Sequence, residues 1–282
     1  MAGDTPSPEE SKQALLDCMA QAEQVVDAAV GPVDDKQLTS GQWLVLGLWL
    51  GCRDLHEAIG TLLSGGFYTE ARILARPMVE DFLRLVFLYQ NRDKLEEWTI
   101  RFYLASYEQE GRLVRSARRL WLDIADELAD QVDRGNAVWK QRAKAAGLKE
   151  RGFPDYPELV QAAGRDEVAH LILFLHHAVH SNRSAVELWV RTNARDADPR
   201  DALGEVAFTS YDVTLALLWA TRVAGCLLNW PNACVQELGD DVRHAMEASL
   251  EAARLPLVQV LDESGAEARP TSAGGRLSRG PQ

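Results

Sequence analysis

The sequence predicts an all-α fold, built as a single helical-bundle domain. Apolar residues recur at helical spacing along nearly the whole chain, and no segment has the period-two alternation between tight turns that marks a β-hairpin. With 46% hydrophobic and 26% charged residues over 282 positions, the chain is long enough to bury a sizeable core. We therefore expect a bundle domain over residues 1–255, followed by a disordered tail over 256–282 that is rich in Gly, Ser, Pro and Arg.

Each expected helix is delimited by apolar periodicity and by the breakers that flank it. The segment "LSGGF" separates the second helix from the third, and Gly111 is a candidate break within a long fourth stretch. The acidic segment "TNARDADPRDALGE", residues 192–205, is expected to be a loop. The helices expected along the chain are 8–30, 39–64, 68–90, 93–133, 135–147, 157–181, 208–229 and 232–254.

Charge and targeting signals narrow the classes of function. A formal net charge of -12 repels a polyanion unless positive charge is gathered locally, as the basic segments 111–121 and 139–151 would allow. The alternative is that these segments are solvated helix faces balanced by nearby carboxylates. The N-terminus lacks a basic region followed by an apolar one, and the longest apolar run, 43–52, is about half of a membrane span, so we expect a cytoplasmic protein that does not interact with membranes.

The cysteine pattern indicates a reducing compartment. None of the four cysteines forms a C-x-x-C pair, and all lie in apolar surroundings, so we expect buried free thiols and no structural metal. They are Cys18, Cys52, Cys226 and Cys234.

Two segments place polar residues where apolar ones are expected. In "GFYTEARILARPMVE", residues 66–80, Arg76 and Glu80 are four residues apart on a helix that is apolar nearly all round, so they are expected to be buried and paired. Such a pair indicates either a site or a polar tie between helices. In the second segment, 165–189, four histidines occur on an otherwise apolar helix: His170, His176, His177 and His180.

These two segments resemble an uncharacterised bacterial family of helical proteins. The resemblance rests on G-F-Y-T-E-A, then L-A-R-P-M-V-E, and later A-V-H-S, although His177 stands where that family has a serine. This combination of helices and short motifs is in turn similar to that of the HEPN superfamily. Many HEPN proteins are ribonucleases of toxin–antitoxin and phage-defence systems. "RDEVAH", Arg165 to His170, fits the HEPN spacing of arginine and histidine.

The HEPN resemblance implies an endoribonuclease that needs no metal and no cofactor. A ribose 2′-hydroxyl attacks the adjacent phosphorus, a histidine moves the proton, and an arginine stabilises the charge on the phosphoryl oxygens. It also implies RNA as a substrate, a homodimer, and an antitoxin or regulatory protein as a partner. The candidate catalytic residues are Arg165, His170, His177, His180, Arg76 and Glu80.

Two other classes of function stay open. Glu167 with His170, and His176 with His180, have the spacing with which helical bundles bind iron, manganese or zinc, but a di-metal carboxylate bundle needs two E-x-x-H motifs and the chain has one. The other class is a non-catalytic interaction protein, whose tryptophan-rich helices bury a partner or a second copy.

Overall fold

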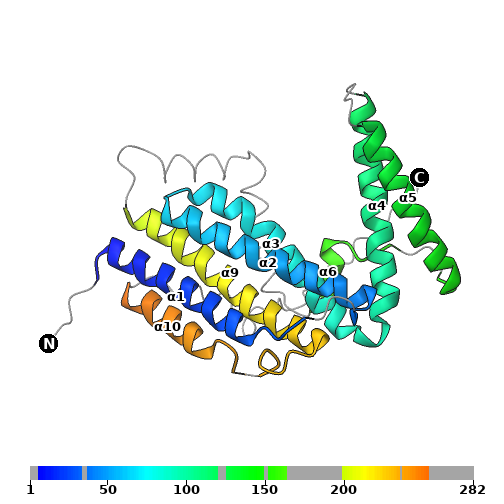
Figure 1. Cartoon of the computed structure of the whole chain (residues 1–282). Helices are drawn as coiled ribbons and strands as arrows, with labels where there is room; N and C mark the ends of the chain where they lie inside the picture. Colours follow the sequence, from blue (N-terminus) through cyan, green and yellow to red (C-terminus); the bar gives the residue numbers. More distant parts are fainter. Residues whose placement is uncertain are drawn as a thin grey trace, which may run out of the picture.

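The computed structural model describes residues 6–33, 37–119, 125–148, 152–163, 199–235 and 237–253. Over these ranges every regular element is a helix, which confirms the predicted all-α class. Figure 1 shows a bundle of long helices, with a hairpin of two further helices standing away from one end. The tail predicted for 256–282 lies outside the described residues.

The first two helices begin where side chains cap the backbone. Helix α1 spans Pro8–Ala29, and helix α2 spans Ser40–Ser64. The Ser7 hydroxyl accepts a hydrogen bond from the backbone of Glu10, whose carboxylate accepts one from the Ser7 backbone. Thr39 forms the same kind of capping box at the start of α2. These side chains satisfy backbone N–H groups that have no partner within the helix, which explains why both helices start where the sequence predicts.

Helix α3, Tyr68–Gln90, is central to the bundle. It packs against α2, against helix α9, Pro199–Leu228, and against the short helix α6, Tyr156–Ala163. Helix α10, Asp240–Ala252, packs against α1, so α1 lies between α9 and α10 (Figure 1). One large apolar core joins these helices, and most of α3 is buried in it.

The remaining two helices form a hairpin that we call the arm. A 3₁₀ turn, Arg92–Lys94, leads from α3 into helix α4, Leu95–Arg119, and the chain returns in helix α5, Ala125–Ala145 (Figure 1). At the root of the arm the rings of Tyr103 and Trp139 stack with centroids 4.3 Å apart. The arm has a small apolar core of its own, made by Val114, Ala129, Val132 and Tyr107.

The predicted breaks within the arm are wrong, and packing explains why. Gly111 lies inside α4, and the boundary expected between residues 133 and 135 lies inside α5, so neither position ends a helix. A Cβ atom on Gly135 would collide with the ring of Tyr107 on the facing helix. Because Gly135 has no side chain, it allows α4 and α5 to approach each other closely, and it does not end the helix.

Boundaries in the C-terminal half also differ from the prediction. Helix α9 begins at Pro199, so residues 199–205 of the expected loop are helical; proline is a favourable first helical residue because it lacks an N–H to satisfy. Helix α10 begins eight residues later than expected, after Gly239, whose φ of 76° ends the preceding turn. Helix α6 ends at Ala163, and the rest of the helix expected over 157–181 lies outside the described residues.

The cysteines are only partly as predicted. All four are free, and Cys18 and Cys52 are buried. Cys226, near the end of α9, is half-buried, and Cys234 is exposed in the turn that follows. The prediction that all four are buried is therefore wrong for these two.

One described helix has the length and composition of a membrane span. It is the stretch Ala202–Leu228 of α9, with a mean hydropathy of 1.3. More than half of its apolar window, 56%, is buried within the bundle, and a core helix of a soluble protein passes the same test.

Asp212 is a carboxylate that the bundle partly buries. Burial raises its pKa from 3.8 to about 7. The folded state therefore binds the Asp212 proton more tightly than the unfolded chain does. As a consequence, the free energy of unfolding falls as the pH rises from about 4 to about 7.

We expect Asp212→Asn to increase the free energy of unfolding by about 2 kcal/mol at pH 8, because the amide never carries the buried charge. At pH 4 the same substitution is expected to have almost no effect, because the aspartate is then protonated in the folded state. Thermal unfolding at both pH values measures this difference. An equal effect at the two pH values would contradict the assignment.

Candidate functional site

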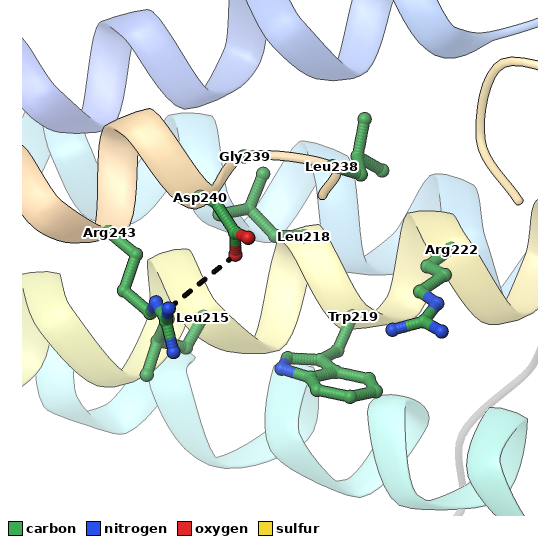
Figure 2. A pocket seen from close by; sticks show the side chains of 8 residues that line it. All are labelled: Leu215, Leu218, Trp219, Arg222, Leu238, Gly239, Asp240 and Arg243. Atoms are coloured by element: carbon green, nitrogen blue, oxygen red, sulfur yellow. Dashed lines mark ion pairs between the residues drawn. The ribbon is translucent and has the colours of Figure 1, made fainter. Parts of the chain in front are cut away.

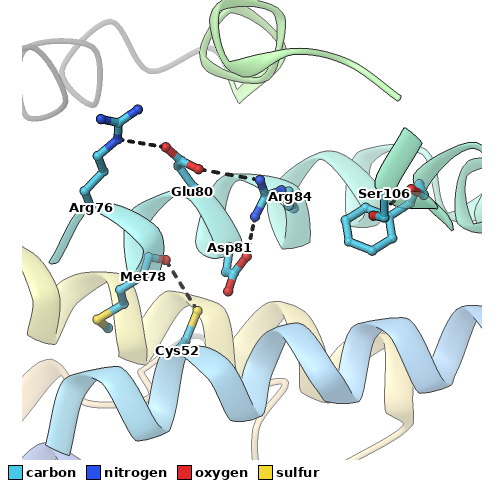
Figure 3. A network of polar contacts seen from close by, with 8 residues as sticks. Cys52, Arg76, Met78, Glu80, Asp81, Arg84 and Ser106 are labelled. Atoms are coloured by element: carbon cyan, nitrogen blue, oxygen red, sulfur yellow. Dashed lines mark hydrogen bonds and ion pairs between the residues drawn. The ribbon is translucent and has the colours of Figure 1, made fainter. Parts of the chain in front are cut away.

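A row of alternating charges lies along one side of α3, and we call it the α3 charge network (Figure 3). Nε of Arg76 lies 3.0 Å from one oxygen of Glu80, and Arg84 lies 3.5 Å from the other oxygen. Arg84 also donates to Asp81 at 2.5 Å. The predicted pairing of Arg76 with Glu80 is therefore confirmed, and it belongs to a chain of four side chains one turn or less apart.

The expected burial of Arg76 and Glu80 is wrong. Their side chains are 28% and 23% exposed, because this side of α3 is covered only in part. An ion pair of this kind contributes about 0.3–0.5 kcal/mol and is within reach of solvent. The dashed line in Figure 3 joins Glu80 to Nε of Arg76, not to its terminal nitrogens. Glu80 thus holds the Arg76 guanidinium in place, and both side chains stay within reach of solvent.

Beneath the network the surroundings become apolar. The Cys52 thiol donates to the carbonyl oxygen of Met78 at 3.5 Å, and burial raises its pKa well above the ordinary value (Figure 3). Burial also raises the pKa of Asp81, and Arg84 partly opposes this effect. The network therefore lies at the border between the core and a polar surface.

Tyr156 of α6 lies close to the network, and the sequence patterns did not single it out. Burial raises the pKa of its hydroxyl most, the charge of Glu80 raises it further, and Arg76 opposes both. The hydroxyl is buried and has no hydrogen-bond partner among the described residues. A buried polar group without a partner is uncommon, so Tyr156 is a candidate for contact with a bound molecule. A tyrosine at the start of a short helix carries no sequence signal for such a role.

The other predicted site residues lie outside the described residues. They belong to the segment 164–198, which follows α6 directly in the sequence. The structure thus brings Arg76 and Glu80 together and, from α6, adds Tyr156 beside them. The site residues outside the described ranges are Arg165, His170, His177 and His180.

Among the described residues, a more deeply buried ion pair is formed by a different arginine. Arg72, only 2% exposed, lies 2.9 Å from Glu205 of α9, which is 15% exposed. Burial lowers the pKa of Arg72 to about 10, and Glu205 opposes that shift. Arg72 and Arg76 are one turn apart on α3, and the sequence alone does not reveal which of them α9 covers.

Two hollows among the described helices lie apart from the α3 charge network. The first is a cavity of about 60 Å³ between α9 and α10, where Arg222 lies over the ring of Trp219 and Arg243 pairs with Asp240 at 3.6 Å. Figure 2 shows the side chains that line it. A groove of about 410 Å³ between α1 and α2 is lined by carboxylates, among them Glu57. The first is too small for a nucleotide, and the second would repel one.

The metal hypothesis depends on residues that the structure does not describe. Within the described ranges, no group of three or more His, Cys, Asp and Glu side chains is placed to bind a metal ion. Glu167, His170, His176 and His180, which motivate that hypothesis, are all in the segment 164–198.

The bundle and its arm define an all-α protein of the helical-bundle class. Over residues 42–196 the chain matches a family of unknown function (DUF5677), and it belongs to that family. The matched range runs from α2 through the arm to the histidine segment, so it contains every candidate residue named above. No curated protein and no solved structure matches the chain.

Proposed function

We propose that the protein is a HEPN-like, metal-independent endoribonuclease that acts in the cytoplasm as a homodimer, in a toxin–antitoxin or phage-defence system. Its substrate is RNA, and a regulatory or antitoxin protein is its partner. The histidines of the segment 164–198 move protons, and Arg76, oriented by Glu80, stabilises negative charge on the phosphoryl oxygens. This division of roles follows from chemistry: imidazole titrates near neutral pH, whereas a guanidinium only carries charge.

The observation that carries the proposal is the placement of the α3 charge network beside α6. Tyr156 lies at the start of α6 near Arg76 and Glu80, and α6 ends two residues before Arg165 in the sequence. Arg76 thus lies next to α6, and the proposed proton-transfer residues follow α6 in the sequence. A fixed cation in a partly desolvated place stabilises a developing oxyanion more than a mobile one does.

The charge of the protein sets the conditions under which RNA binds. With a formal net charge of -12, the chain repels RNA at long range. In the arm, Arg112 pairs with Glu108 at 2.6 Å and Arg118 with Asp126 at 3.0 Å, which favours the balanced-face interpretation of this basic segment. We therefore expect weak, salt-sensitive RNA binding, or delivery of RNA by a partner.

Arg76→Ala is expected to lower the rate of RNA cleavage by about 10²–10³, the effect of losing one group that stabilises the transition state. The fold should survive, because the Arg76–Glu80 pair is partly exposed. Cleavage of a labelled single-stranded RNA at low salt in EDTA measures the rate, and circular dichroism checks the helical content.

Arg53→Ala is the matched control for Arg76→Ala. Arg53 is on α2 and pairs with Asp27 of α1 at 2.9 Å, so it also is a partly exposed arginine in an ion pair, but on another helix. Its substitution should leave the cleavage rate unchanged. Equal rates for the wild type and Arg76→Ala would exclude Arg76 from the reaction.

A non-catalytic interaction protein is the second candidate, and the arm is the feature that favours it. The arm stands away from the bundle and exposes Leu113 and Val138, which are 61% and 51% accessible (Figure 1). A projecting hairpin with exposed apolar side chains offers a place at which another protein could make contact. The RNA assay separates the two candidates, because a scaffold leaves the RNA intact.

A further inference from the structure

The chain turns back on itself after α9, and backbone contacts fix the turn. The Trp230 N–H donates to the Gly225 carbonyl oxygen at 2.8 Å, and the Ala233 N–H donates to the Trp230 carbonyl oxygen at 3.1 Å. Asn229 has a φ of 61°, the left-handed conformation that reverses the chain. Trp230 is buried and packs edge-on against Trp49, with ring centroids 4.9 Å apart. The core thus holds the turn in place.

This turn brings two cysteines together. A Cβ atom added to Gly225 would lie 3.3 Å from Cα of Ala233, so the two backbones are in direct contact. The next residue after each is a cysteine, so this backbone contact places Cys226 and Cys234 next to each other. The pair is eight positions apart in the sequence, a spacing that no short cysteine motif covers.

The thiols of Cys226 and Cys234 are more accessible to solvent than those of the other two cysteines. Cys234 is exposed and Cys226 is half-buried, whereas Cys18 and Cys52 are buried in the core. All four are free. A small oxidant in solution therefore reaches this pair before it reaches the other two thiols.

We propose that Cys226 and Cys234 form a redox-active dithiol, which low-molecular-weight disulfides such as glutathione disulfide convert to an intramolecular disulfide. The proposal is independent of ribonuclease activity, because it rests on the turn between α9 and α10 and not on α3.

The reaction proceeds by two thiol–disulfide exchanges. One of the two cysteines loses its proton, and its thiolate attacks one sulfur of glutathione disulfide. The sulfur–sulfur bond breaks, and glutathione leaves as a thiolate that takes up a proton. The other cysteine then loses its proton and attacks the protein sulfur of the mixed disulfide, which displaces the second glutathione as a thiolate that also takes up a proton. Two protein thiols are oxidised, and one glutathione disulfide is reduced to two glutathione molecules.

The new bond would join the last turn of α9 to the segment that leads into α10. The disulfide would therefore hold the segment between α9 and α10 in its folded position, and α10 itself packs against α1. Closing this short loop limits the unfolded chain, so the oxidised protein should unfold at a higher temperature than the reduced one.

Trypsin provides a direct test, because one peptide, residues 223–243, contains both cysteines and ends at Arg243. The full chain is incubated with glutathione disulfide at pH 8, the remaining thiols are alkylated, and the digest is analysed by mass spectrometry without reductant. The wild-type peptide is expected to lose the mass of two hydrogen atoms and to carry neither alkyl group nor glutathione.

The single variants Cys226→Ser and Cys234→Ser should lose this product completely. In Cys234→Ser the exchange stops at the mixed disulfide, so a glutathione adduct persists. Cys18→Ser is the control and should behave as the wild type. The proposal is overturned if the wild-type peptide keeps both thiols alkylated, or keeps a glutathione adduct as Cys234→Ser does.

Discussion

Glu205→Ala is expected to lower the free energy of unfolding by about 3–5 kcal/mol, the effect of removing one member of a buried ion pair. Arg72 is only 2% exposed and lies 2.9 Å from Glu205, so the substitution takes away the carboxylate that compensates its buried charge. The pair also joins α3 to α9 in the centre of the bundle. Urea unfolding followed by circular dichroism measures the loss.

Glu108→Ala is the matched control for this experiment. Glu108 pairs with Arg112 at 2.6 Å, but both side chains are largely exposed on the arm. Solvent screens such a pair, so the midpoint of unfolding should hardly change. Joint replacement of Arg72 and Glu205 by methionine and leucine should recover much of the stability, because the buried charges are then gone together. If Glu205→Ala unfolds at the same urea concentration as Glu108→Ala, the buried pair does not hold α3 to α9.

His170→Ala and His180→Ala are each expected to abolish RNA cleavage while the helical circular-dichroism signal remains. The proposed reaction needs a group that both takes and gives a proton near neutral pH, and imidazole is the side chain suited to this. The assay is the same as for Arg76→Ala, at low salt and with concentrated protein. The matched control is His244→Ala, since His244 is an exposed histidine on α10 that contacts Glu247. Cleavage at the wild-type rate by both His170→Ala and His180→Ala would remove the histidines from the mechanism.

The sequence predicts the N-terminal helices well because local signals define them. Ser7 and Thr39 begin capping boxes, and the two glycines after Ser64 separate α2 from α3. In the arm the local signal fails. Gly135 is a helix breaker by propensity, but the ring of Tyr107 on the facing helix requires a residue without a side chain at that position.

The candidate site could be predicted only in part, for a similar reason. Helical spacing correctly pairs Arg76 with Glu80, because that contact is local to α3. Which arginine becomes buried depends on the path of α9, more than a hundred residues later in the chain, so the expected burial of Arg76 was wrong and Arg72 is the buried arginine. Two further features also depend on contacts between distant or turning segments that no periodicity encodes: the position of Tyr156, and the pairing of Cys226 in α9 with Cys234 in the turn that follows.

The most direct test of the central claim is the chemistry of the RNA product. Purified protein is incubated at low salt in EDTA with a single-stranded RNA, and the new ends are identified by mass spectrometry, with His170→Ala protein prepared in parallel. Attack by the 2′-hydroxyl predicts fragments that end in a 2′,3′-cyclic phosphate, formed by the wild type and absent with the variant. Intact RNA after long incubation with concentrated protein, or cleavage that appears only when a divalent metal is restored, would contradict a metal-independent ribonuclease.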